Sequence, residues 1–63
     1  MPQYTRIAPG VYDDNEGGMH INVSELLKAN GYADTPENRE TLAAAARDLI
    51  QAQYPETTIV VSE

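Results

Sequence analysis

The segment TPENRETLAAAARDLIQAQY, from Thr35 to Tyr54, decides the fold, because it carries every signal of one long helix. The Thr35 hydroxyl can cap the first turn, and Pro36 suits the first helical position, where no backbone N–H is needed. The interior holds strong helix formers and neither Gly nor Pro. Pro55 ends the helix, since the residue before a proline is pushed out of the α region. We therefore predict a helix over about residues 36–54.

Apolar residues recur along this helix at intervals of three and four, which predicts one buried stripe. The stripe consists of Leu42, Ala45, Ala46, Leu49, Ile50 and Tyr54. Leu49 lies in its middle, and we expect this residue to be central to the core. The alanines are small, so a sheet or a second helix can approach closely.

The residues before the helix predict a β-hairpin over about residues 4–23. Residues 4–12 are rich in Tyr, Thr, Ile and Val, which favour strands. Pro9 and Gly10 interrupt this strand, so we expect it to be bent there or to lie at a sheet edge. Residues 19–23 alternate apolar and polar side chains, as a half-buried strand does.

The hydrophobic pattern also predicts the register of the hairpin. Val11 and Ile21 should share the core face, because a slip of one residue would expose one of them. This pairing requires a three-residue loop over residues 15–17, with Gly17 in the left-handed conformation.

Two further elements complete the predicted domain. Ser24 can cap a short helix over about residues 25–30, which Gly31 ends in the left-handed conformation. A β-branched run predicts a C-terminal strand over about residues 57–62. The order β-β-α-α-β predicts a single α+β domain over residues 1–63. We expect a three-stranded, mainly antiparallel sheet with both helices on one face.

Composition excludes several classes of protein. The chain has 63 residues, no Cys, one His and a formal net charge of −6. It therefore lacks the ligands of common zinc sites and the basic cluster that direct nucleic-acid binding needs. Its apolar runs are far shorter than the ~20 residues of a membrane span. Residues 1–6 contain no apolar run, so we expect no signal peptide, no membrane contact and a cytoplasmic location.

The turn after residue 12 has some features of a calcium loop. Asp13, Asn15 and Gly18 match its first, third and sixth positions. However, the fifth position is Gly17 and the twelfth is Ser24, so two oxygen ligands are missing. We predict a plain hairpin turn that holds no metal, and the sequence suggests no cofactor.

One face of the predicted sheet is left without a helix, and on it we place a candidate partner interface. This interface consists of Tyr12, His20, Asn22 and Val60. His20 titrates near neutral pH when unperturbed, but no nucleophile or second carboxylate converges on it by sequence. We therefore expect a contact surface and not an active site. A chain this short buries only ~60% of its unfolded surface, which favours a homodimer.

The acidic residues raise a second hypothesis. A negative patch forms if the hairpin tip and the start of the long helix lie on one side. Its members would be Asp13, Asp14, Glu16, Asp34, Glu37 and Glu40. We favour a non-enzymatic, small acidic protein-interaction module. The alternative is an acidic inhibitor or nucleic-acid mimic, of the phage anti-defence type, that occupies a basic groove on a protein target. Carboxylates aligned along one face would favour the mimic, and a mixed surface would favour the interaction module.

Overall fold

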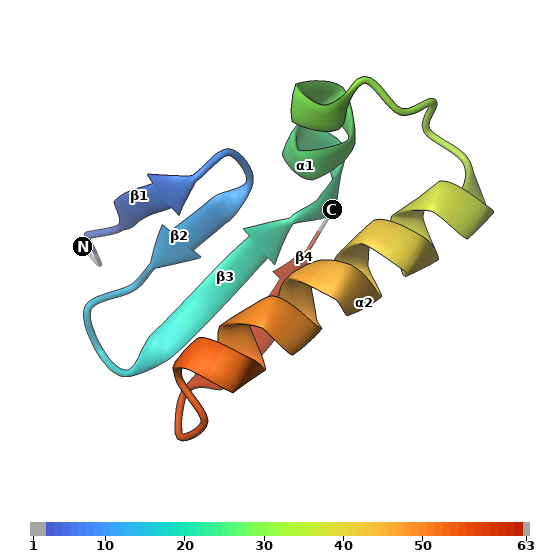
Figure 1. The fold of residues 1–63 in the computed structure, drawn as a ribbon. Helices are drawn as coiled ribbons and strands as arrows, with labels where there is room; N and C mark the ends of the chain where they lie inside the picture. Colours follow the sequence, from blue (N-terminus) through green and yellow to red (C-terminus); the bar gives the residue numbers. More distant parts are fainter. Residues whose placement is uncertain (1–2, 63) are drawn as a thin grey trace.

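The computed structural model describes residues 3–62 as a small α+β domain with two helices and one mixed four-stranded sheet (Figure 1). Its elements are β1 (Thr5–Ala8), β2 (Val11–Asp13), β3 (Gly18–Asn22), α1 (Val23–Asn30), α2 (Pro36–Gln53) and β4 (Thr58–Ser62). The strands lie in the order β1-β2-β3-β4. Met1 and Pro2, which belong to the segment considered for a signal peptide, lie outside the described residues. The α+β class is as predicted.

The sheet has four strands because the predicted first strand is two strands. Ala8 pairs with Val11, so Pro9 and Gly10 form a tight turn and not a bend. Gly10 has a φ of +80°, which favours glycine. Its carbonyl oxygen accepts a 2.7 Å hydrogen bond from the backbone N–H of Asn22, which packs the turn against the end of β3. The prediction of three strands is therefore wrong.

The fourth strand also makes the sheet mixed. β1 with β2 and β2 with β3 are antiparallel, but β4 runs parallel to β3. The reason is the return path of the chain. The 18 residues of α2 span about 27 Å and carry the chain back to the end where β3 begins. A parallel neighbour needs a long crossover of this kind.

The hairpin between β2 and β3 has the predicted register. Val11 pairs with Ile21, and Asp13 pairs with Met19. The backbone N–H of Asp14 donates to the carbonyl oxygen of Gly18 at 3.0 Å, which leaves a three-residue loop. Gly17 closes this loop with a φ of +89°, in the predicted left-handed region.

The caps of the two helices differ in how well the sequence predicts them. The Thr35 hydroxyl accepts from the backbone N–H of Asn38 at 3.1 Å, as predicted for α2. For α1 the cap is Asn22, whose Oδ1 accepts from the backbone N–H of Glu25 at 2.9 Å. The predicted cap, Ser24, lies inside the first turn, where its hydroxyl accepts from Arg39 at 3.0 Å. α1 starts early because β3 leads into it directly.

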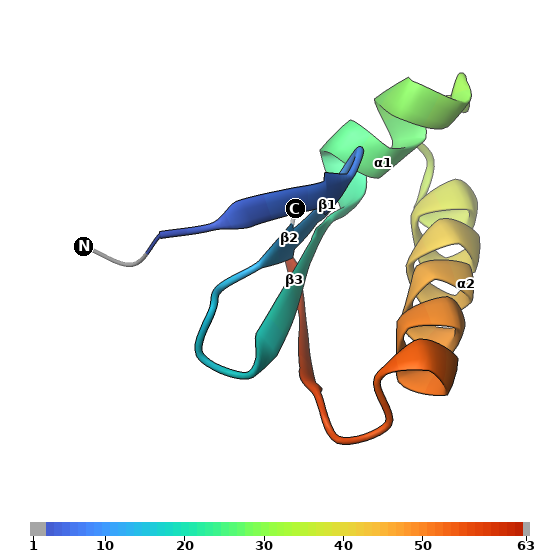
Figure 2. The same cartoon turned by 60° about the vertical axis from the view of Figure 1, so that its left-hand side comes forward.

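The core lies between the helices and one face of the sheet (Figure 2). Its buried residues are Met19, Ile21, Val23, Leu27 and Ile50. The expectation that Leu49 is central to the core is wrong, because this residue is 66% exposed. α2 is rotated so that Ile50 and Ala46 pack inward, while Leu49 is turned toward the β1–β2 hairpin.

Candidate interaction surface

The sheet face opposite the core carries a row of side chains from three neighbouring strands. Tyr12 of β2 pairs with His20 of β3, and His20 pairs with Val60 of β4. Their sequence neighbours, such as Val11 and Ile59, pack against the core, so the row points the other way. Three of the four residues of the predicted interface are therefore side by side. We call Tyr12, His20 and Val60 the sheet-face row.

His20 is held in place by an acid and an aromatic ring. Its Nε2 lies 3.0 Å from Oδ2 of Asp14. The other carboxylate oxygen of Asp14 accepts from the backbone N–H groups of Glu16 at 2.8 Å and Gly18 at 3.0 Å. These bonds lower the pKa of Asp14, the Glu16 N–H most, followed by His20 and then Gly18. The ring of Tyr4 meets the imidazole edge to face, with centroids 5.1 Å apart.

Tyr12 is held by a carboxylate from α1. Its hydroxyl donates to Oε2 of Glu25 at 2.6 Å, and this hydrogen bond raises the pKa of Tyr12. The second oxygen of Glu25 lies 3.1 Å from Nη2 of Arg6. Arg6 and Glu25 thus form an ion pair beside the row, and the Asp14 carboxylate lies within hydrogen-bond distance of His20.

Asn22, the fourth predicted interface residue, has a structural task, since its side-chain oxygen caps α1. It also lines a shallow hollow of about 350 Å³ beside the row. The other lining residues are Tyr4, Tyr12, His20, Glu25 and Ser62. The hydroxyl of Ser62 donates to the carbonyl oxygen of Ile21 at 3.2 Å. The hollow therefore presents aromatic rings and hydrogen-bonding side chains, which suit a contact.

Sequence reasoning did not find three of the residues that shape this surface. Tyr4 and Arg6 alternate with Thr5 and Ile7, and this alternation is a signal that places them on one face. The signal is hidden when residues 4–12 are treated as one strand. Glu25 belongs to a helix, and nothing in the local sequence predicts that it reaches Tyr12.

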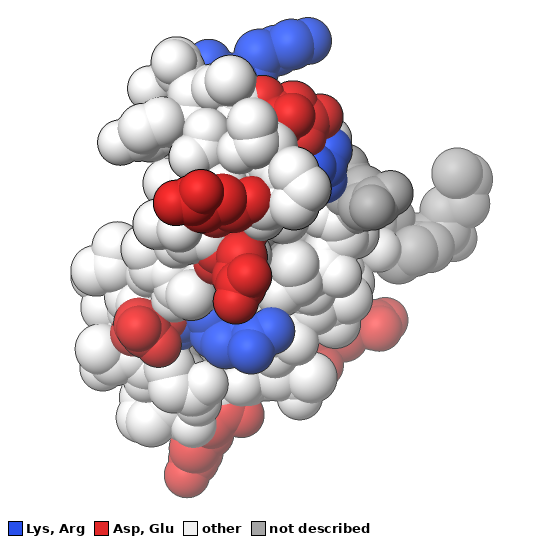
Figure 3. Space-filling model, turned by 90° about the vertical axis from the view of Figure 1, so that its right-hand side faces the viewer, with Lys and Arg blue, Asp and Glu red and all other residues white. Residues whose placement is uncertain are grey.

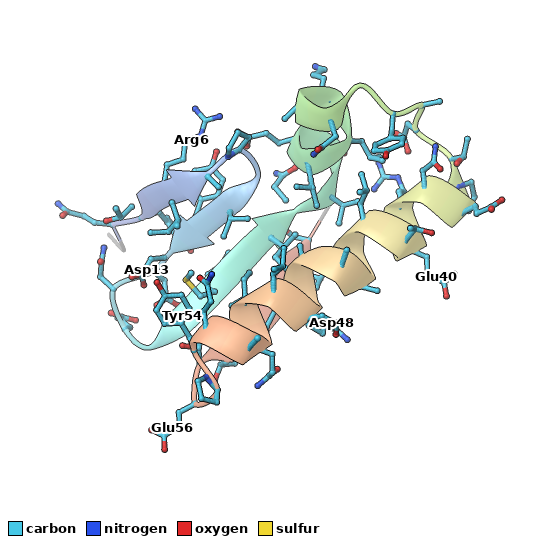
Figure 4. The ribbon with its side chains drawn as sticks, in the orientation of Figure 1. Arg6, Asp13, Glu40, Asp48, Tyr54 and Glu56 are labelled. Carbon is cyan, nitrogen blue, oxygen red and sulfur yellow. The ribbon has the colours of Figure 1, made fainter. Side chains whose placement is uncertain are left out.

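The structure does not bring the six residues of the predicted acidic patch together. The hairpin tip and the start of α2 lie at opposite ends of the molecule, as Asp13 and Glu40 show in Figure 4. Near the start of α2, Nη2 of Arg39 binds Oδ2 of Asp34 at 2.9 Å, and Arg39 lowers the pKa of Asp34. Acidic and basic side chains are mixed on the face shown in Figure 3.

The carboxylate oxygens of Asp13 and Asp14, at the hairpin tip, accept hydrogen bonds from backbone N–H groups of the same loop. Oδ1 of Asp13 accepts from the backbone N–H of Asn15 at 2.9 Å, and Asp14 accepts from two further N–H groups. Among residues 3–62, no three His, Cys, Asp or Glu side chains are grouped so that they could hold a metal ion. Within the same residues, neither helix has the length and apolar character to span a membrane.

Comparison with known proteins found no relative of this chain. No protein-family model, curated protein or solved structure matches the chain.

Proposed function

We propose that the chain is a small acidic protein-interaction module of the cytoplasm, without enzymatic activity, which contacts its partner through the sheet-face row. The observation that carries this proposal is the row itself. It places a tyrosine, a histidine and the 41% exposed Val60 on three adjacent strands, on the face of the sheet opposite α2 (Figure 2). Tyrosine is enriched at the centres of protein interfaces.

The pairing of charges beside the row supports a contact with a second copy of the chain. Arg6 forms an ion pair with Glu25, and the Asp14 carboxylate is bonded to His20 and to two backbone N–H groups, so the charged groups beside the row have partners within the chain despite the net charge of −6. Two-fold dimers are the commonest oligomers, and a two-fold axis would bring this sheet face against the same face of a second copy. A homodimer is therefore the first partner to test.

The alternative function is that of an acidic inhibitor or nucleic-acid mimic. The net charge of −6 supports it, since a basic groove attracts such a chain. The separation of Asp13 from Glu40, and the place of Arg39 beside Asp34, favour the interaction module instead.

Affinity capture from the native host tests the proposed function. Tagged wild type is compared with Val60→Lys, which places a charge in the row, and with Ala44→Lys, which adds the same charge on the exposed side of α2. We expect the wild type and Ala44→Lys to retain the same partner and folded Val60→Lys to lose it. Retention by Val60→Lys, or no partner for any variant, would contradict the proposal. Capture of a nucleic-acid-binding protein that DNA displaces would favour the inhibitor.

A further inference from the structure

An apolar groove lies on the helix side of the sheet, between the β1–β2 hairpin and α2. Its volume is about 380 Å³. Ile7 and Val11 form the hairpin wall, Leu49 and Tyr54 form the α2 wall, and Met19 contributes from β3. The groove exists because the helices leave the β1–β2 side of this face open (Figure 2).

The walls of the groove expose large apolar side chains over a buried floor. Leu49 is 66% exposed, Ile7 is 51% exposed and Tyr54 is 47% exposed. Beneath them Met19 and Ile50 are buried in the core. Grouped apolar side chains of this kind mark contact sites on soluble domains, whereas single exposed ones do not.

The charge near the groove indicates which kind of partner it binds. Among the described residues, no charged side chain lines the groove. At its lower end it adjoins a second hollow, in which Asp13 lies together with Ile7, Met19 and Tyr54 (Figure 4). With a net charge of −6, the chain attracts cationic partners. A second copy would instead bring the same carboxylate and the same net charge to this contact.

We propose that this groove binds the apolar face of a basic amphipathic helix from a partner protein. The proposal rests on the proposed interaction function but uses the opposite side of the sheet. Ala46, Leu49, Ile50 and Gln53 follow one another at helical spacing along the groove. Ala46 and Ala29 are small, so a helix backbone can approach them closely. An amphipathic helix in an apolar groove is a recurring mode of recognition.

A synthetic peptide tests this proposal. The probe is an amphipathic helix of about 18 residues, with Leu and one Trp on one face and Lys on the other. The chain contains no Trp, so the fluorescence shift on burial reports the peptide alone. A second peptide carries Glu in place of Lys. We expect saturable binding of the Lys peptide with a blue-shifted emission, and no binding of the Glu peptide.

Two variants that add the same charge distinguish binding in the groove from nonspecific electrostatic attraction. Leu49→Glu and Ala44→Glu each add one negative charge to an exposed position of α2, but only Leu49 lines the groove. We expect Leu49→Glu to weaken Lys-peptide binding at least about tenfold, as loss of an interface anchor does. Ala44→Glu should bind as the wild type or more tightly, and Val60→Lys should keep the blue-shifted emission.

The remaining outcomes overturn the proposal. No binding of the Lys peptide, or equal binding by Leu49→Glu and Ala44→Glu, removes the groove as a helix site. If Leu49→Glu abolishes self-association in solution, a second copy occupies the groove. Failure of peptide binding leaves the sheet-face row in place, because its test uses Val60 on the opposite face. Self-association that Leu49→Glu abolishes and Val60→Lys retains would instead place the dimer contact in the groove and not in the row.

Discussion

Gly10 sets the turn between β1 and β2 in a conformation that other residues rarely adopt. Its φ is +80°, and an added Cβ would lie 3.0 Å from the carbonyl oxygen of Asn22 and from the backbone N of Leu26. We expect Gly10→Ala to lower the free energy of unfolding by about 1–3 kcal/mol, measured by urea denaturation.

Gly17→Ala is the matched control for this prediction. Gly17 also has a positive φ, but an added Cβ would meet nothing within 4 Å. Gly17→Ala therefore measures backbone strain alone. If Gly10→Ala costs no more than Gly17→Ala, the turn is not packed closely against Asn22 and Leu26.

Asp14 makes the stability of the hairpin depend on pH. Its pKa in the folded chain lies below the ordinary value of 3.8, first because the Glu16 N–H binds its ionised form. A lowered pKa contributes stability that is present at neutral pH and is lost as the pH falls from about 5 through the folded pKa. We expect Asp14→Ala to lower the melting temperature clearly at pH 7 and much less at pH 2.

Asp48→Ala serves as the control, because Asp48 is exposed on α2. Its difference from the wild type should stay small across the same pH range. A wild-type advantage over Asp14→Ala that does not shrink in acid would show that the carboxylate of Asp14 does not support the loop.

At the scale of the element, the orientation of α2 decides what is core and what is surface. Ile50 is 7% exposed, whereas its neighbour Leu49 is 66% exposed. We expect Ile50→Ala to cost about 2–5 kcal/mol of unfolding free energy and Leu49→Ala less than about 1 kcal/mol. Chemical denaturation of both variants measures the difference. The reverse order would show that α2 is rotated so that Leu49, and not Ile50, faces the core.

The helical pattern predicted that α2 exists but not which side of it faces the sheet. Its apolar stripe is broad, because the run of alanines that ends at Ala46 widens the apolar surface around the helix. A 3.6-residue period marks such a stripe, and the area of sheet beneath the helix decides which part is buried. The cap of α1 was predicted at Ser24, and this prediction is wrong. Asn22 is also a residue type that caps helices well, and it stands where β3 ends.

At the scale of the whole molecule, the row of Tyr12, His20 and Val60 could be predicted because strand alternation fixes the face of each residue. The groove could not be predicted, because it depends on where α2 lies over the sheet. The acidic residues failed to form one patch for the same kind of reason. Sequence gives their number, but the path of the chain places Asp13 and Glu40 at opposite ends.

The sheet-face row is the basis of the proposed function, and sedimentation equilibrium tests it most directly. Wild type and Val60→Lys are compared over a range of concentrations at pH 7. We expect a reversible dimer for the wild type, because the sheet-face row of one copy would contact the row of the other. Val60→Lys should remain a folded monomer. A wild-type monomer at every concentration, or a Val60→Lys dimer as tight as the wild type, would contradict the account.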